Sequence, residues 1–154
     1  MATKSAELTS IESGSLVNPR ANGRLRFKSA TINGGTAGQV LRFFRVRSND
    51  CIKELKGSIS AAVGSSVTEV GLHDINTGSE VDADEFAAAN QFTRTALTIA
   101  GLMPLKQANP NQLVWEGLGL TSDPGIEYDV TITLTTMGST AGDITLSMYY
   151  NSGD

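Results

Sequence analysis

Residues 128–135 read YDVTITLT and residues 143–150 read DITLSMYY, and both stretches alternate apolar with polar side chains. Successive side chains of a β-strand point to opposite faces of a sheet, so this period of two predicts two strands with one apolar face each. The connecting residues 136–142 read TMGSTAG, which predicts that the two strands form a hairpin. A lone hairpin is not stable in water, so the apolar faces need a second layer. The pattern therefore predicts a β-sandwich or a barrel.

Further strands are predicted upstream by similar short apolar runs. They cover residues 25–32, 40–46, 51–59, 67–73, 96–99 and 113–116. The pair Asn33-Gly34 favours a tight turn after the first of them, and the sequence SDPG at 122–125 favours a turn before the final hairpin. Seven or eight short strands separated by turn residues are typical of a sandwich or jelly roll. We therefore expect an all-β chain with a jelly-roll-like antiparallel β-sandwich.

One short helix is expected in the middle of the chain. Residues 82–90 read DADEFAAAN, with an Asp three positions before a Glu and then a run of alanines. This spacing is the signature of a capping box at the start of a helix.

The amino-terminal residues lack sustained periodicity. Residues 1–23 are polar overall, so we expect an extended N-terminal arm, with residues 24–154 forming a single β-sandwich domain. The first twenty residues include charged side chains and no long apolar run, so no secretory signal is predicted. The arm does contain four apolar side chains that could anchor in a neighbour's groove, namely Leu8, Ile11, Leu16 and Val17.

The composition suits exposed strand faces and turns, and it also suits surfaces that other subunits cover. At 154 residues the chain has the length of one domain. Its charged fraction of 18% is below the roughly 25% of typical soluble domains, with Thr, Ser, Gly and Asn in place of the charges. The single cysteine, Cys51, excludes an intrachain disulfide and a zinc cluster. No stretch approaches the eighteen or so apolar residues of a membrane span, so we expect no membrane partner and a chain that is soluble where it is made.

Charge is unevenly distributed along the chain. Residues 1–56 hold ten basic and four acidic residues, a net charge of +6, and the remainder holds two basic and twelve acidic residues, a net charge of −10. Basic strands that pair with acidic strands inside one sheet would explain this asymmetry. A polar molecule that docks by charge complementarity would explain it equally. Nucleic acid is not the expected partner, because the sequence pI is near 5.0 and the adjacent Phe43 and Phe44 cannot form one stacking platform on a strand.

No motif in the sequence predicts catalysis. His73 is the only histidine, and no nucleophile elbow accompanies it, so we expect a packed or surface histidine, no catalytic residue and no cofactor. Residues 74–85 place oxygen ligands at positions 1, 3 and 12 of a calcium loop, but Ser79 occupies the position that requires glycine. An acidic surface loop with a helix cap explains the same residues, and we expect no metal. Trp115 is expected in the core, with sugar stacking as the alternative.

Four segments taken in order resemble one family. They are GQVLRFFRV at 38–46, VGLHD at 70–74 with VDADEFA at 81–87, LVWEGLGLTSDP at 113–124, and YDV at 128–130. Together they resemble the capsid decoration or cement proteins, also called head-stabilising proteins, of tailed bacteriophages. The resemblance extends over roughly residues 20 to 150, and the segment at 113–124 is its most specific part.

The resemblance implies a structural role without chemistry. Such proteins are commonly jelly rolls that sit on the outer surface of an icosahedral shell and clamp neighbouring major capsid subunits. It implies a virion protein made in the host cytoplasm, a homotrimer, and the major capsid protein as partner, with no enzyme activity. The expected capsid contacts are Leu8, Ile11, Leu16, Val17, Arg20, Arg24, Arg26, Arg42 and Arg45. The alternative is a β-sandwich module of a virion tail or fibre that binds host carbohydrate.

Overall fold

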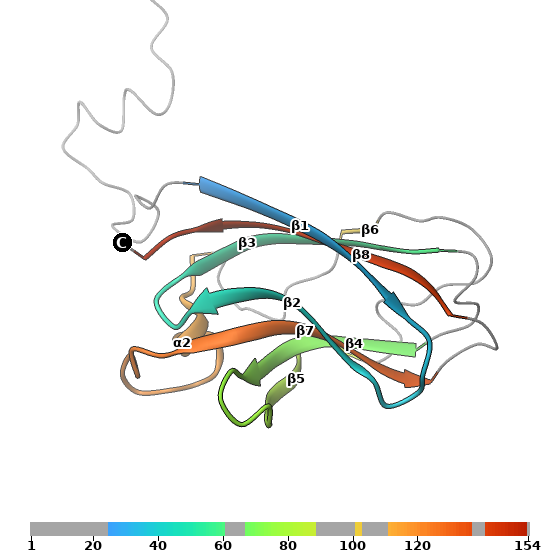
Figure 1. Cartoon of the computed structure of the whole chain (residues 1–154). Helices are drawn as coiled ribbons and strands as arrows, with labels where there is room; N and C mark the ends of the chain where they lie inside the picture. The colour runs from blue at the N-terminus through green and yellow to red at the C-terminus, as the bar shows by residue number, and fades with distance from the viewer. Residues whose placement is uncertain (1–24, 61–66, 89–100, 103–110, 137–140, 154) are drawn as a thin grey trace, which may run out of the picture.

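The computed structural model describes residues 25–60, 67–88, 101–102, 111–136 and 141–153. Within these residues eight strands form two antiparallel four-stranded sheets that pack face to face (Figure 1). The first, called here the β1 sheet, contains in order β1 (Leu25–Gly34), β8 (Gly142–Asn151), β3 (Cys51–Ile59) and β6 (Gly101–Leu102). The second, the β2 sheet, contains in order β2 (Val40–Arg47), β7 (Glu127–Thr136), β4 (Val67–Asp74) and β5 (Glu80–Ala87).

The connections between strands make the sandwich a jelly roll. The chain changes sheet at every connection except the one from β4 to β5. The strand orders 1-8-3-6 and 2-7-4-5 are those of the eight-stranded double-sheet jelly roll. The predicted all-β class and jelly-roll-like architecture are therefore confirmed.

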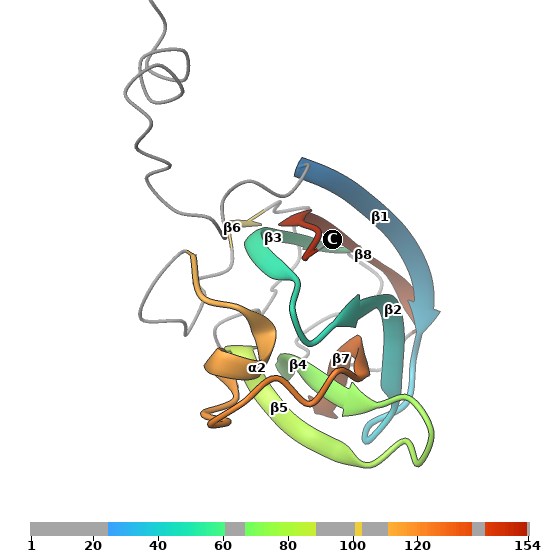
Figure 2. The same cartoon turned by 90° about the vertical axis from the view of Figure 1, so that its left-hand side faces the viewer.

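The final hairpin predicted from the sequence is wrong, although both of its strands exist. β7 pairs with β2 and β4, whereas β8 pairs with β1 and β3 in the other sheet. Both are central strands, and they lie in opposite layers of the sandwich instead of side by side (Figure 2). Their apolar side chains belong to one common core. Pairing within one hairpin would leave both apolar faces on the same side of one sheet, still needing a cover.

The core lies between the two sheets and is built mainly from the inward faces of the central strands. Fully burying one such aliphatic side chain contributes about 1.5–3 kcal/mol. The largest fully buried side chains of the core are Phe86, Ile52, Leu55, Ile59, Leu72, Ile132, Leu134, Ile144, Leu146 and Met148.

The tight turn predicted at Asn33-Gly34 is also wrong. Gly34 is the buried last residue of β1, and a Cβ there would lie 2.9 Å from the Leu41 side chain. The chain reverses further on, at Gly38, whose φ of 80° is accessible to glycine at no steric cost. The Gly38 N–H donates to the Leu134 carbonyl at 2.6 Å, which fastens this turn to β7.

The helix predicted over residues 82–90 is a strand as far as residue 87. The Asp82 side chain does bond to a nearby backbone group, but its partner is the Asp84 N–H, at 3.1 Å, inside a bulge of β5. Glu85, Phe86 and Ala87 are buried, so packing of this edge strand overrides the helix propensity of the alanine run. The bulge crosses Gly71 so closely that a Cβ there would lie 2.1 Å from the Asp82 carbonyl oxygen.

Within the described residues the helix is α2 (Val114–Gly117), which lies where a strand was predicted. Glu116 Oε2 accepts the Leu113 N–H at 3.0 Å, and the β2–β3 turn accepts the next two backbone N–H groups through the carbonyls of Asp50 and Ser48. The prediction that Trp115 is buried is wrong as well. Val114 points into the core, and Trp115, next on the helix, stays partly exposed.

The predicted strand at 96–99 and the predicted N-terminal arm lie outside the described residues. In the part of the chain that is described, no helix has the length and apolar character that crossing a membrane requires.

Candidate functional site

The first half of β1 presents opposite chemistry on its two sides. Leu25 and Phe27 point outward and are 61% and 55% exposed. Arg26 and Lys28 point to the other side, toward the gap between the two sheets. β1 is an edge strand, so both sides are accessible to a partner.

The phase of β1 is fixed by its second half. Ala30 and Ile32 pack against the core, and side chains two positions apart share a face, so Arg26 and Lys28 must face inward. The β1–β8 register runs without a bulge from Leu25 to Gly34, so the strand has no irregularity at which it could rotate. The exposure of Leu25 and Phe27 therefore follows from the fold itself.

An aromatic side chain of β8 extends this apolar surface. Tyr149 lies opposite Phe27 in the register, with ring centroids 4.8 Å apart. The Lys56 ammonium lies 5.8 Å from the Tyr149 ring centroid on the other side, and Lys56 also pairs with Glu54 at 3.3 Å. The three residues Leu25, Phe27 and Tyr149 are called the apolar patch below. Exposed large apolar groups that gather in one place mark interaction sites more often than scattered ones do.

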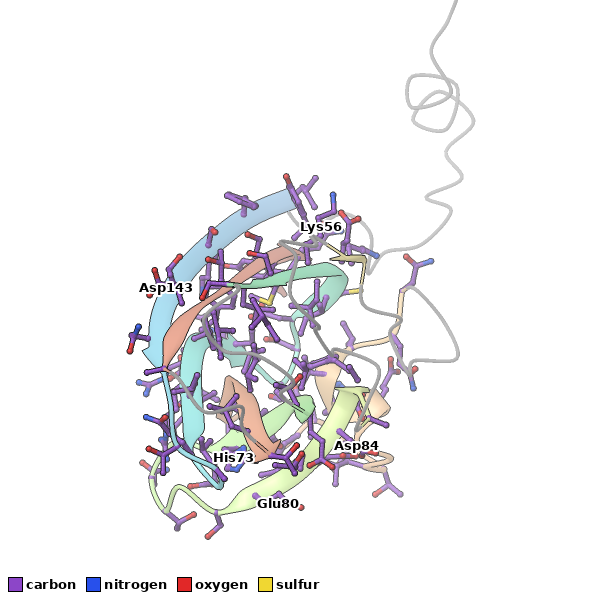
Figure 3. The ribbon with its side chains drawn as sticks, turned by 90° about the vertical axis from the view of Figure 1, so that its right-hand side faces the viewer. Lys56, His73, Glu80, Asp84 and Asp143 are labelled. Atoms are coloured by element: carbon purple, nitrogen blue, oxygen red, sulfur yellow. The ribbon has the colours of Figure 1, made fainter. Side chains whose placement is uncertain are left out.

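Uncharged hydrogen-bonded pairs continue this outer face along β1 and β8. The Ser29 and Ser147 hydroxyls are 2.8 Å apart, and those of Thr31 and Thr145 are 2.7 Å apart. Figure 3 shows Lys56 and Asp143 on this layer of the sandwich, with His73, Glu80 and Asp84 on the opposite layer. The outer face between Lys56 and Asp143 is thus poor in charge, as the centres of protein interfaces are.

A basic hollow lies on the inner side of β1. It has a volume of about 240 Å³ and opens between the edge strands β1 and β2. It is called the basic groove below, and the lining residues that carry its charge or frame it are Arg26, Lys28, Arg45, Arg47, Glu127 and Tyr150. A second hollow of about 310 Å³ shares Arg47 and Glu127 with it and is lined also by Ile126.

Lys28 is held in place within the basic groove. Its Nζ donates to the Arg45 carbonyl oxygen at 2.7 Å and lies 5.0 Å from the centroid of the Tyr150 ring. Because its stem is also partly buried, the ammonium position is fixed before any partner arrives.

The Asp50 carboxylate lines the same groove but is turned to the backbone. Its Oδ2 accepts the Arg47 N–H at 2.8 Å and its Oδ1 accepts the Gly153 N–H at 3.1 Å. These bonds hold the β2–β3 turn against the segment that follows β8. Both oxygens of the Asp50 carboxylate therefore accept hydrogen bonds from the backbone.

Arg42 and Arg45 meet a carboxylate on the outer face of the β2 sheet. Arg42 Nη1 lies 3.0 Å from Asp129 Oδ2, and Arg45 Nε lies 3.2 Å from Asp129 Oδ1. Arg45 is also directly opposite Asp129 in the β2–β7 register. For these two arginines, the sheet-pairing explanation of the charge asymmetry is confirmed.

The predicted capsid contacts are thus distributed over several places. Arg26 and Arg45 border the basic groove, whereas Arg42 lies over the β4–β5 turn, close to Gly78. Outside the described residues lie Leu8, Ile11, Leu16, Val17, Arg20 and Arg24. The apolar patch and Lys28 were not among the predicted contacts. The alternation LRFK at 25–28 was the available signal, but it predicted only a strand and not which of its faces is exposed.

Of the two positions expected for the single histidine, packed or on the surface, the structure shows the packed one. His73 is buried on β4, and its Nδ1 lies 2.9 Å from the Thr131 hydroxyl. Burial lowers the pKa of His73 from its ordinary value, and Arg42 lowers it further, against the opposing effects of Glu80 and Asp129.

The segment that resembles a calcium loop is a tight turn followed by a strand. Asp74 Oδ1 accepts hydrogen bonds from the backbone N–H groups of Asn76 and Thr77 and from the Thr77 hydroxyl. These bonds lower the pKa of Asp74. From residue 80 the segment belongs to β5, so its later oxygens do not turn back toward Asp74. Among the described residues, no three His, Cys, Asp or Glu side chains gather as metal ligands would.

Comparison with known proteins identifies solved structures with a similar fold. No protein-family model matches the chain, and neither does any curated protein. A chain in the capsid of Ralstonia phage GP4 is similar in structure, with a TM-score of 0.54, 12% identity, and coverage of 84% of this chain and 86% of that one. A chain in the capsid asymmetric unit of cyanophage Pam1 has a TM-score of 0.52 and 11% identity, with 85% of each chain covered. The protein therefore shares its jelly-roll fold with chains from two phage capsids.

Proposed function

We propose that the protein is a structural component of a bacteriophage virion that decorates the outer surface of an icosahedral capsid. In this role it binds across neighbouring major capsid subunits and stabilises their contact. The observation that carries the proposal is the similarity of fold to chains in two phage capsids, over 84% to 86% of both partners in each pair. Because coverage is nearly equal in both directions, the matched chains are about as long as this one.

The surface chemistry of β1 supports attachment to another protein. The apolar patch and the neighbouring hydroxyl pairs offer a surface poor in charge, and the basic groove beside it offers fixed cations. Interfaces that combine a dehydrated apolar centre with a charged rim are typical of specific protein docking. We assign capsid attachment to this end of β1, together with the residues of the N-terminal arm. The role is a binding role, without catalysis or a cofactor.

The proposed assembly is a homotrimer on the shell. Three copies around a threefold or quasi-threefold position would bring three β1 edges to three capsid subunits at once, and linked binding sites raise the overall affinity well above that of one site. Light scattering of the purified protein tests this directly. A monomer at all concentrations would restrict trimer formation to the capsid surface.

The experiment that tests the proposed function is quantitative mass spectrometry of purified virions. A decoration protein should be present at a copy number comparable with that of the major capsid protein, and it should leave the particle under conditions that keep the shell intact. A copy number far below that of the capsid protein would favour the tail or fibre module that binds carbohydrate, with the Phe27–Tyr149 pair as its sugar-stacking surface. Absence from virions would overturn both roles.

A further inference from the structure

We propose that the open edge of β1 binds an extended segment of a partner protein as an added strand, so that the β1 sheet continues into the partner. The segment carries an acidic side chain opposite Lys28. Its side chains opposite Phe27, Ser29 and Thr31 are uncharged. The inference rests on the proposed function, because the partner is taken to be the major capsid protein. It goes further by naming how the two proteins join and which side chains the partner presents.

An edge strand directs backbone groups away from its sheet. In an antiparallel pair, every second residue bonds the neighbouring strand with both its N–H and its C=O, and the residues in between direct these groups to the other side. Within the described residues β1 pairs with β8 alone and is the outermost strand of its layer (Figure 1). Such an edge is a template for pairing with another chain, and proteins usually protect it with bulges, charges or a short length.

The other three edge strands of the described sandwich have such protection. β2 has a register shift between Arg42 and Phe44, where the strand is irregular. β5 shifts its register twice against β4, and its sequence EVDADEFA is rich in acidic residues. β6 is only two residues long. None of these three edges offers a partner a long, regular strand.

β1 is the long and regular edge of the sandwich. It has ten residues, and its register with β8 runs from Leu25 to Gly34 without a shift. It contains no proline, and beyond Phe27 its one charged residue is Lys28. Peptides that bind by β-augmentation use edges of this kind, where main-chain hydrogen bonds supply affinity and alternate side chains supply specificity.

Lys28 makes this edge selective. A charge on the inner side of an edge strand discourages pairing with any strand that cannot neutralise it. The Lys28 Nζ donates to the Arg45 carbonyl oxygen at 2.7 Å, and among the described residues it has no carboxylate partner. Directly opposite side chains of paired strands have Cβ atoms about 4.5–5.5 Å apart, so an acidic residue of the added strand would reach the ammonium. A strand with a carboxylate at that position is therefore preferred.

The outer side of β1 favours uncharged side chains. Phe27 packs against the Tyr149 ring, with centroids 4.8 Å apart. The Ser29 and Thr31 hydroxyls each lie within hydrogen-bonding distance of a hydroxyl of β8. An added strand would place its own outer side chains beside these rows, and matched cross-strand pairs stabilise a sheet. An apolar residue beside Phe27 and a Ser or Thr beside each hydroxyl would continue the rows.

A second copy of this chain fits the edge less well. β1 reads LRFKSATING and contains no acidic residue, so two β1 strands paired about a twofold axis cannot place a carboxylate opposite Lys28 in any register. The acidic edge strand β5 of another copy is interrupted by its two register shifts. We therefore assign the edge to a strand of a different protein.

Hydrogen–deuterium exchange of the full-length protein tests the pairing. Exchange is followed by mass spectrometry on the free protein and on the protein bound to stripped capsids of the parent phage. Peptides that cover residues 27–33 should exchange at least about tenfold more slowly on the capsid, because alternate amides of β1 gain a hydrogen bond. Peptides from β5, an edge strand of the other sheet, are the control and should exchange equally fast in both states.

Proline variants separate backbone pairing from contact through side chains. Ser29→Pro and Ala30→Pro each remove one N–H, and adjacent residues direct theirs to opposite sides of β1. The variant that loses an outward N–H should keep its circular dichroism and bind stripped capsids at least about tenfold more weakly, whereas the other loses a bond to β8 and should be destabilised. Ser29→Ala is the matched control, since it removes the hydroxyl but keeps the N–H, and it should bind nearly as well as the wild type.

A charge variant tests the acidic residue of the partner. Lys28→Gln should weaken capsid binding about three- to tenfold, as loss of a charge-assisted contact does. Lys56→Gln removes one lysine charge from the outer face of the same sheet and should leave the affinity unchanged. Equal effects of the two variants would overturn the assignment of a carboxylate opposite Lys28.

Three further results would overturn the inference. They are equal exchange of residues 27–33 on and off the capsid, full binding by the proline variant that stays folded, and protection of residues 27–33 in the free protein that grows with its concentration. The last would assign the edge to a second copy. If both proline variants unfold, the exchange measurement decides. A protein that binds no capsid would overturn the proposed function too, whereas a bound protein with an unprotected β1 edge would refute only the inference.

Discussion

Phe27 and Tyr149 face each other across the β1–β8 register on the side of the sheet that points away from the core, with ring centroids 4.8 Å apart. Aromatic pairs of this kind contribute about 0.5–1.5 kcal/mol beyond the area they bury. The pair therefore helps to fasten an edge strand while it leaves apolar surface in solvent. If the pair served only to stabilise the strand, the exposed position beside it would not need an apolar residue such as Leu25.

Replacing Phe27 should weaken attachment to the capsid while the chain stays folded. Phe27→Thr keeps a good strand residue at this position, so the free energy of unfolding should fall by no more than about 1.5 kcal/mol. Phe86→Ala, at a fully buried position, should cost about 3–5 kcal/mol in the same urea titration. Occupancy of Phe27→Thr on stripped capsids should nevertheless drop strongly. Equal destabilisation by the two substitutions would make Phe27 a packing residue.

Neutralising Arg42 and Arg45 together should leave the monomer folded. Both arginine side chains are exposed, but they pair with one largely buried carboxylate, so the double variant Arg42→Gln/Arg45→Gln leaves Asp129 without a cation. It should lose about 3 kcal/mol, more than an exposed ion pair contributes, which is about 0–1 kcal/mol. Asp129→Asn should affect stability more than either single arginine variant, because one buried carboxylate serves both partners.

The same double variant tests the predicted role of these arginines on the shell. If they also contact capsid protein, occupancy on particles should fall in the variant, and wild-type occupancy should fall as ionic strength rises. Occupancy that responds to neither change would leave sheet pairing as their only role.

Stability should decrease on mild acidification because of His73. Burial lowers the pKa of His73 in the folded protein below the ordinary value of 6.5, so the unfolded chain binds a proton at a higher pH than the folded chain does. Above pH 6.5 the imidazole is neutral in both states, so its burial does not reduce the free energy of unfolding. As the pH falls below that value, the unfolded chain takes up a proton that the folded chain does not, and the free energy of unfolding decreases. Urea titrations between about pH 8 and pH 5 should show the decline in the wild type but not in His73→Gln.

A second, separate decline is expected in stronger acid. Hydrogen bonds lower the pKa values of Asp74 and Asp123 below 3.8, so their contributions persist to lower pH and are lost only below that value. An unchanged slope between pH 8 and pH 5 in His73→Gln would assign the first decline to other groups.

Gly71→Ala, which adds a single methyl group, should lower the melting temperature strongly. A Cβ at this position would lie 2.1 Å from the Asp82 carbonyl oxygen and 2.3 Å from the Ala83 carbonyl carbon, so the backbone of β5 would have to move. Gly38→Ala is the matched control, since its φ of 80° costs an L-residue about 1–2 kcal/mol but its Cβ meets nothing within 4 Å. Thermal melting should rank the wild type above Gly38→Ala and Gly38→Ala above Gly71→Ala. The reverse order would mean that the β5 bulge adapts easily.

Removal of the predicted arm should abolish attachment and spare the fold. A chain that begins at Gly23 keeps every described strand, so its circular dichroism and melting midpoint should match those of the full-length protein. Without Leu8, Ile11, Leu16 and Val17 it should bind stripped capsids poorly. Binding at full affinity would leave the β1 surface as the sole docking element.

The period-two patterns predicted the strands well but not their partners. β7 and β8 have almost the predicted limits, yet they belong to different sheets. A period of two reports which face of a strand is buried, and a small polar connection is compatible both with a hairpin and with a crossing between sheets. Local helix signals failed at 82–90 because the packing of Phe86 outweighs propensity.

The candidate site was less predictable than the fold. Arg26 was expected to contact a partner, but no role was predicted for its exposed neighbours Leu25 and Phe27. Leu25 and Phe27 are exposed because Ala30 and Ile32 pack against the core and so decide which face of β1 is buried. Ala30 and Ile32 are less prominent as apolar residues in the sequence than Leu25 and Phe27 are. Lys28 contacts the Tyr150 ring and the Arg45 carbonyl oxygen, and these are tertiary contacts that no local sequence pattern predicts.

The position of β8 also has a consequence for synthesis. β8 lies between β1 and β3, and its residues pair with positions far away in the chain, such as Ser147 with Ser29, 118 positions apart. Pairings of such long sequence separation form slowly. Until Asn151 has left the ribosome, the β1 sheet lacks one of its two central strands, and the nascent chain exposes apolar faces and unpaired edges that favour aggregation. Only chains translated through the end of β8 can therefore present the shape that a partner would recognise.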